Sequence, residues 1–445
     1  MLKFNKIFLI YSLIIMLCLF NFGNIYADDI LSHIDSEQTI KAGEKLTITR
    51  CIEIALKNQP TITASQATMY AVETTIEQAQ SAYYPQISVN GGFNRTSNPV
   101  ISSDIINTYN QFSAGAAFNQ LIYDFGRASS VVDAAKYNYE ASSAAYNNIV
   151  TQAVFNVKTA YYNMAQAMRN LEVTNEVVKQ FKQHLDQAEA FYDVGLKAKI
   201  DVTTAKVNYT NSRLQLITAK DALKSAKVSL RKTLGIMYNQ DFTIDDNISI
   251  NKYNLSLDDA VKEAIANRPD LKTAKANISA AQMSVKSSEA NYYPTITGSA
   301  NYNRYENSPS SSSAYSTWGA SIGAQVNFNI FNGFITKKQV EQAQLNLNSI
   351  KATEESVRQT VISDVEQAYL NLMDTFETIP EAELAALQSK DNLDIVNGRY
   401  STGLSSPIEV TDAEISYENA KLAHIKALIA YKIAEASIEK AVGIK

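Results

Sequence analysis

Glycine and proline, the residues that most often interrupt helices, are scarce in this sequence. Of 445 residues, 15 are glycine and 8 are proline. These are about 3% and 2% of the chain, against roughly 7% and 5% in an average protein. Long uninterrupted helices are therefore expected. Hydrophobic residues make up 46% and charged residues 19%, so the composition excludes a disordered chain.

Basic excess, paired cysteines and catalytic clusters are also lacking. The net charge is −5 and lysine and arginine form no cluster, so the electrostatic footprint of a nucleic-acid-binding protein is missing. His33, His184 and His424 do not pair at metal-ligand spacing, and no glycine-rich phosphate loop occurs. The sequence therefore predicts no enzyme, no cofactor and no metal site.

The first 27 residues have the pattern of a secretory signal. Lys3 and Lys6 precede the apolar run 7–20, and Ala27 supplies a small residue before Asp28. An uncleaved membrane anchor is the alternative, but the run is shorter than the roughly 20 residues that span a bilayer. Removal of the signal with its two lysines changes the net charge to −7 and leaves Cys51 alone, so no intramolecular disulfide is expected.

An internal duplication is the strongest feature of the chain. Residues 46–60 match 255–269, and residues 81–95 match 290–304, both at an offset of 209. Residues 191–209 match 399–417 at an offset of 208. The duplication predicts a first repeat over 28–235, a linker over 236–254 and a second repeat over 255–445.

Within each repeat the hydrophobic periodicity changes twice. One helix is expected from 46 to 84, where Tyr83-Tyr84-Pro85 ends it. Alternating apolar and polar residues then predict two β-hairpins, and heptad spacing predicts long coiled-coil helices. The hairpins are expected at 86–123 and 295–331, the long helices at 126–195 and 334–400, and their return helices at 196–235 and 406–442. Pro380 is expected to bend or break the second long helix.

Strands with one apolar and one polar face are what a transmembrane β-barrel requires. An antiparallel hairpin on a soluble core would alternate equally well. Aromatic residues at the strand ends favour the membrane, because they match an interfacial belt: Tyr83, Tyr84, Tyr123, Tyr292, Tyr293 and Phe331. Four strands cannot close a barrel, and lipid does not tolerate open sheet edges. The predicted fold is therefore mostly α-helical, with long antiparallel coiled coils and a membrane β-barrel that oligomerisation completes.

The order of these features resembles the TolC-type outer-membrane efflux proteins over the whole mature chain. The resemblance also rests on LIYDFG at 121–126, VGL at 194–196 and TGL at 402–404. It implies a homotrimer whose twelve strands form one barrel in outer-membrane lipid and whose helices form a periplasmic tunnel. It further implies a passive exit duct for efflux or type I secretion. Such ducts work with a periplasmic adaptor (membrane fusion) protein and an inner-membrane pump of the ABC, RND or MFS type.

The resemblance also implies functional residues at the turns far from the barrel. Adaptor contacts are expected at the tip residues Gly195, Leu196, Gly403, Leu404 and Ser405. Glu409 and Asp412 match acids that ring the closed periplasmic entrance, and Asp201 and Tyr400 match positions that hold neighbouring coils shut.

Two of these assignments have open alternatives. Ser406 to Glu409 also has the form of a helix capping box, so Glu409 is either a cap or part of the entrance. The family places an arginine where this chain has Ser405. Without this arginine, the contact that holds the coils shut is expected to be weaker, or to use another basic residue: Lys197, Lys199 or Arg399.

Two other classes of protein compete with an export channel. A trimeric surface stalk would need one terminal barrel rather than two inserted hairpins. A general porin would not devote some two thirds of its chain to coiled helices. Whether the cargo is a drug, a metal ion or a secreted protein does not follow from the sequence.

Overall fold

A computed structural model of the chain describes residues 43–99, 106–236, 241–246, 249–250, 253–309 and 315–444. The predicted signal at 1–27 lies outside them. The chain forms two compact units. The hairpin unit comprises residues up to Thr63, Ala153–Asn251 and Glu377–Ile433, and the sheet unit comprises Ala64–Gln152, Lys252–Phe376 and the residues from Ala434 onward. Among the described residues, no helix is both long enough and apolar enough to cross a membrane.

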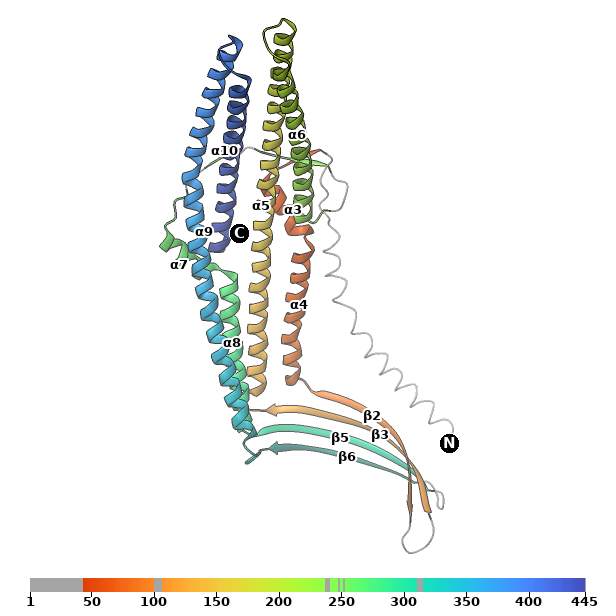
Figure 1. Cartoon of the computed structure of the whole chain (residues 1–445). Coiled ribbons are helices and arrows are strands. Elements are labelled where there is room, and N and C mark those ends of the chain that lie inside the picture. Colours follow the sequence, from red (N-terminus) through yellow and green to blue (C-terminus); the bar gives the residue numbers. More distant parts are fainter. Residues whose placement is uncertain are drawn as a thin grey trace. The chain divides into compact units, whose positions relative to one another are not determined.

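Two antiparallel helical hairpins dominate the hairpin unit (Figure 1). Helix α5 (Arg127–Asp193) returns as α6 (Lys199–Thr233), and α9 (Ile335–Ser401) returns as α10 (Pro407–Val442). Buried apolar side chains at three- and four-residue spacing hold them together, including Val157, Tyr161 and Met164 on α5, as expected of a coiled-coil seam. Helix α9 continues through Pro380, so this proline does not break it.

The single helix predicted over 46–84 is wrong, because the structure has two helices there. Helix α3 (Ile48–Asn58) ends before Pro60, which begins α4 (Pro60–Gln80), and the short η1 (Ser81–Tyr83) follows. The second repeat has the same break between α7 (Leu257–Asn267) and α8 (Pro269–Glu289), followed by η2 (Ala290–Tyr292). Gln59 and Arg268 have ψ angles of 115° and 125°, because the proline ring excludes the helical conformation for the residue before it.

A small parallel sheet packs against α5 in the hairpin unit. Strand β1 (Glu44–Leu46) pairs with β4 (Phe242–Ile244), which lies in the segment predicted to be a linker. Leu46, Phe242 and Ile244 are at most 1% exposed. The Tyr161 hydroxyl on α5 donates a hydrogen bond to the Asp245 carbonyl at 2.5 Å. The segment is therefore part of a folded core rather than a simple connection.

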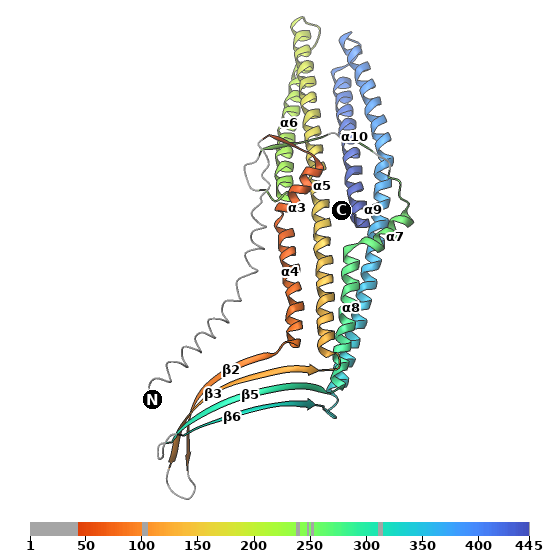
Figure 2. The same ribbon diagram turned by 180° about the vertical axis from the view of Figure 1, so that it is seen from behind.

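The sheet unit contains one four-stranded antiparallel sheet in the order β2-β3-β5-β6 (Figure 2). The strands are β2 (Gln86–Pro99), β3 (Ile106–Tyr123), β5 (Thr295–Pro309) and β6 (Tyr315–Asn327). The hairpin predicted over 295–331 therefore ends its second strand four residues early. The two hairpins join through β3 and β5, so β2 and β6 are the edges.

The register separates the sheet into an apolar and a polar face. Val89 lies opposite Ala116, which lies opposite Tyr302, which lies opposite Ala320. Ile322, two residues farther along β6, is on the same face and 90% exposed. The other face carries small and amide residues: Ser88, Asn90, Gly115, Asn301, Asn303, Ser321 and Gly323. The sheet thus exposes apolar side chains on one side without a core to cover them, which marks an interaction surface.

Candidate functional site at the hairpin turns and the sheet

The predicted tip residues form two similar helix-ending turns. Gly195 and Gly403 have φ angles of 77° and 78°, a conformation that favours glycine. In each turn the next amide also donates back into the helix, from Leu196 to the Phe191 carbonyl and from Leu404 to the Arg399 carbonyl, as in a Schellman cap. The side chains of Leu196 and Leu404 are 70% and 72% exposed. The turns therefore expose two apolar side chains to solvent.

Glu409 caps the start of helix α10, which is one of the two roles that the sequence allowed. The Ser406 amide donates to Glu409 Oε1 at 3.4 Å, and the Glu409 amide donates to Ser406 Oγ at 3.2 Å. The Ser405 hydroxyl donates to Glu409 Oε2 at 2.7 Å. The bond from Ser405, then the one from the Ser406 amide, lowers the pKa of Glu409. Glu409 is thus an ionised cap at the start of α10.

Asp412 differs from Glu409 because nothing holds its carboxylate. It lies one turn farther along α10 and is exposed. Within the described part of the chain it takes part in no hydrogen bond or salt bridge. The equivalent residue of the first repeat, at the offset of 208, is Thr204, whose hydroxyl donates to the Ile200 carbonyl at 3.0 Å. At this position, the second hairpin therefore carries a free carboxylate and the first hairpin a hydroxyl group.

Asp201 and Tyr400 do not form a direct hydrogen bond within this chain. Asp201 caps α6, accepting from the Ala198 amide at 3.2 Å. Tyr400 is 3% exposed and packs with Val396 and Val410. Burial first, and the charge of Asp201 second, raise the pKa of Tyr400, so the two groups influence each other electrostatically.

Ser405 is buried rather than exposed at the tip, and its role as an adaptor contact stays a prediction. Its side chain is 5% exposed and bonded to Glu409. Of the three basic candidates to replace the missing arginine, Lys197 places its ammonium group 5.5 Å from the centre of the Tyr400 ring. Arg399 donates to the Leu404 carbonyl at 3.3 Å. Lys199 accepts from the Thr203 hydroxyl with its carbonyl at 3.0 Å, and within the described residues its side chain forms no hydrogen bond or salt bridge. Lys197 is thus the cation nearest to the position expected of a lock.

The sequence analysis missed a buried acidic cluster between the two hairpins. Glu414 on α10 has a side chain 2% exposed, and its Oε1 lies 2.7 Å from His184 Nε2 on α5. The approach is close but poorly aligned, because neither Glu414 oxygen accepts a hydrogen bond. One turn along, burial first and the charge of Glu414 second raise the pKa of the buried Glu418. His184 is 230 positions before Glu414 in the sequence, so no local pattern brings these two residues together.

Replacing Glu418 by glutamine is expected to stabilise the protein at neutral and alkaline pH. A raised pKa means that folded Glu418 binds its proton more tightly than unfolded Glu418, so stability falls as pH rises through the folded pKa. The amide removes this loss. We expect Tm at pH 8 to rise by about 1 to 3 °C and to be nearly unchanged at pH 4, as followed by circular dichroism. Glu383→Gln, at an exposed position on α9, is the control, and equal shifts in both variants would contradict the prediction.

The predicted interfacial aromatics are all exposed at the helix-facing ends of the strands. Tyr83, Tyr84, Tyr123, Tyr292, Tyr293 and Phe331 are between 48% and 74% exposed. The sequence analysis missed Phe125, which stacks on Tyr293 with ring centres 5.3 Å apart, and Phe334, which meets Phe331 edge-on at 5.4 Å. Both have positive φ, 55° and 67°, which is rare for a bulky residue. The repeated strand-to-helix return thus holds a phenylalanine in an unusual conformation.

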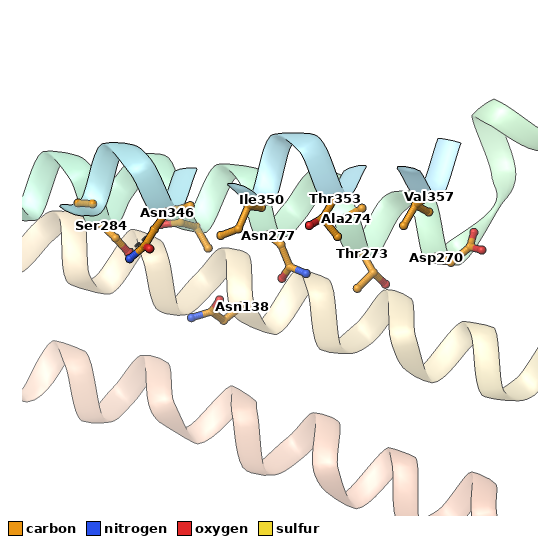
Figure 3. A pocket seen from close by; sticks show the side chains of 13 residues that line it. Asn138, Asp270, Thr273, Ala274, Asn277, Ser284, Asn346, Ile350, Thr353 and Val357 are labelled. Atoms are coloured by element: carbon orange, nitrogen blue, oxygen red, sulfur yellow. Dashed lines mark hydrogen bonds between the residues drawn. The ribbon is translucent and has the colours of Figure 1, made fainter. Parts of the chain in front are cut away.

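A shallow groove of about 510 Å³ runs between α5, α8 and α9 in the sheet unit (Figure 3). Asn138, Asn277 and Asn346 line it from the three helices. Its one acid, Asp270, is paired with Arg268, so the groove holds no free acid or base. Elsewhere, too, the described residues contain no group of three or more potential metal ligands.

Comparison with known proteins finds a matching family model. A family model described as "Outer membrane efflux protein" matches residues 51–236 and 260–444. The two matched segments together cover most of the chain and correspond to its two repeats.

Individual relatives and solved structures agree with this match. The chain is 25% identical over 402 residues to the outer membrane protein TolC of Escherichia coli, covering 87% of this chain and 80% of TolC. It is 23% identical to the outer membrane efflux protein BepC of Brucella suis, covering 86% and 82%. The fold is similar to that of the outer membrane protein VceC of Vibrio cholerae, with a TM-score of 0.75 at 18% identity, covering 89% and 96%.

Proposed function

Because the chain belongs to the outer membrane efflux protein family, we propose that it is the exit duct of a tripartite export system. It is an outer-membrane efflux channel with a periplasmic helical domain, like the relatives it resembles. In this proposal it conducts cargo passively from an inner-membrane pump of the ABC, RND or MFS type and a periplasmic adaptor. Drug efflux and type I secretion are both compatible with such a duct.

The observation that carries the proposal is the four-stranded sheet with two open edges. Its apolar face is exposed, and its edge strands β2 and β6 have unpaired backbone groups. Open edges are not tolerated in lipid, and four strands are fewer than the smallest filled barrel requires. Three copies would supply twelve strands and pair every edge, with the apolar face toward lipid and the amide-rich face toward a water-filled lumen.

The turns would then form the periplasmic end of the duct. Leu196 and Leu404, with the glycines before them, are proposed to contact the adaptor. Asp412 is proposed to face the lumen, where threefold symmetry gathers three carboxylates. Glu409 and Asp201 would support this end as helix caps, and Tyr400 as a buried contact.

Expression of the full chain in a Gram-negative host is expected to place it in the outer membrane as a trimer whose chain begins at Asp28. N-terminal sequencing of the outer-membrane fraction and light scattering in mild detergent measure these properties. Recovery as a soluble periplasmic monomer would contradict the proposal, and a monomer in detergent would contradict the shared barrel.

A variant with Ile322→Asp, which puts a charge on the apolar face, is expected to lower the yield of assembled trimer.

A further inference from the structure

Helix α6 has an exposed face that combines apolar and basic residues; one of these, Lys206, also pairs with Glu189 on α5, with Nζ 3.1 Å from Oε1. Ile200, Val207 and Leu214 recur at seven-residue intervals with Ile217 beside them, and each is more than half exposed. A parallel row of Lys199, Lys206, Arg213 and Lys220 has the same interval, and all four are exposed. Helix α6 holds eight basic and two acidic residues, a net charge of +6. This face has the form of a second coiled-coil seam next to the one shared with α5.

The last part of α9 has the opposite character. Residues 377–401 hold five acidic and two basic residues, a net charge of −3. The outward heptad positions carry apolar residues between 48% and 63% exposed, Leu384, Leu387 and Ile395, and four acids, Glu377, Glu381, Asp391 and Asp394. Lys390 and Arg399 occupy other heptad positions. Within the described residues, none of the four acids forms a salt bridge, so the face is both acidic and unpartnered.

These two faces do not meet within one chain. In Figures 1 and 2, α6 and the end of α9 flank the hairpin unit on opposite sides. The contacts between the hairpins reach α10 at Glu414, Lys421 and Thr411, from His184, Glu176 and Asn208. They reach α9 at Tyr400, which His184 and Lys197 approach. Copies of a protein that has complementary faces on two sides can associate around a rotation axis and form a closed ring.

The contacts between the hairpins also show that the two turns are level. His184 lies eleven residues before Gly195, and its partner Glu414 lies eleven residues after Gly403. Glu176 lies nineteen residues before Gly195, and Lys421 lies eighteen residues after Gly403. Because rotation about the ring axis preserves height, residues of two copies that lie equally far from their turns are at the same level.

At equal height the two faces match in register. Leu214 lies nineteen residues after Gly195, and Leu384 lies nineteen before Gly403. Lys220 lies twenty-five residues after Gly195, level with Glu377 at twenty-six before Gly403. Lys206, at eleven residues, is level with Asp391 at twelve. One apolar pair and two pairs of opposite charge are thus level in an antiparallel pairing, while Val207 is level with Asp391 and Ile217 with Glu381.

We propose that α6 of one protomer packs antiparallel against α9 of the next protomer, with Leu214 against Leu384 and Lys220 beside Glu377. The inference rests on the proposed homotrimer and adds which faces meet and in which register. Surface ion pairs contribute little individually, so the apolar contacts supply most of the attraction and the charges select the register.

Disulfide crosslinking tests the register directly. The variant Leu214→Cys/Leu384→Cys, oxidised as the assembled full chain in detergent, is expected to shift from the monomer band to covalent dimers and trimers on a denaturing gel. The native Cys51 does not interfere, because it is fully buried and burial raises the pKa of its thiol to about 12. The mismatched control Leu214→Cys/Ile395→Cys places its cysteines eleven residues out of register, about 16 Å along the helix, beyond disulfide reach.

A charge reversal gives a second, independent readout. Within the Cys pair, Lys220→Glu is expected to lower the initial crosslinking rate roughly threefold at low salt, and adding Glu377→Lys is expected to restore it. A trimer by light scattering without the Leu214–Leu384 crosslink would overturn the inference and leave the proposed function intact; these faces would then be available to another protein such as the adaptor. Equal crosslinking of the matched and mismatched pairs would also overturn it. A monomer by light scattering would instead contradict the proposed trimer itself.

Discussion

Replacing Gly235 by alanine is expected to destabilise the chain far more than the same change at Gly195. Both glycines end a helix of the first hairpin with positive φ, 69° and 77°. At Gly195 an added Cβ meets nothing within 4 Å. At Gly235 it would lie 2.5 Å from the Asn58 carbonyl oxygen and 3.0 Å from the Gln59 Cα, which are backbone atoms and cannot rotate away.

The two variants separate backbone strain from steric overlap. Gly195→Ala adds only the left-handed strain, about 1 to 2 kcal/mol. Gly235→Ala adds an overlap at the α3–α4 break, for a total of about 2 to 5 kcal/mol. Guanidinium unfolding followed by circular dichroism measures the difference, with the yield of folded protein as a second readout. Equal midpoints for both variants would show that the α3–α4 break moves away from the added methyl group at little cost.

The same contact recurs in the second repeat, which links the duplication to packing. Gly443, at the offset of 208 from Gly235, has φ of 85°, and its added Cβ would lie 3.1 Å from the Arg268 Cα. In both repeats the end of a return helix therefore packs against the break before a proline. The matched sequences around Pro60 and Pro269 preserve this break, although the helical periodicity on either side made 46–84 look continuous.

Sequence patterns were sufficient where a structure depends on neighbours in the chain. The alternation in the strands, the heptads of α5 and the capping box at Glu409 each involve residues within a few positions of one another, so the local pattern contains the information. The family membership predicted from their repeated order is confirmed by the match of the family model to both repeats.

Sequence patterns were insufficient where contacts are distant or elements are short. Strands β1 and β4 have three residues each, too few to reveal a two-residue period, and they pair across most of the first repeat. His184 and Glu414 are joined only because two hairpins lie side by side. Ser405 looked like an exposed turn residue, but its hydroxyl is drawn inward by the carboxylate of Glu409.

Replacing Asp412 by asparagine is expected to remove most of the cation selectivity of the channel. If the proposed trimer places three Asp412 side chains around the lumen, two charges about 7 Å apart interact by roughly 0.6 kcal/mol in bulk water and roughly 2.4 kcal/mol at an effective dielectric of 20. A narrow entrance behaves more like the second case, because low-dielectric walls focus the field. We expect the cation-to-anion permeability ratio in planar bilayers to fall roughly fivefold or more, and block by multivalent cations to weaken.

Three further variants determine whether the effect belongs to the position or merely to the charge. Asp193→Asn removes the same charge beside the turn of the first hairpin, where the side chain is also exposed, and is expected to leave selectivity unchanged. Glu409→Gln keeps an acceptor for the Ser406 amide and is expected to alter selectivity less than Asp412→Asn. Tyr400→Phe removes the buried hydroxyl near Asp201 and is expected to raise the open probability without changing selectivity. Unchanged selectivity and block in an Asp412→Asn/Glu409→Gln channel would mean that both acids lie outside the conduction path, since an acidic ring in a narrow pore cannot be neutralised without changing the ions it admits.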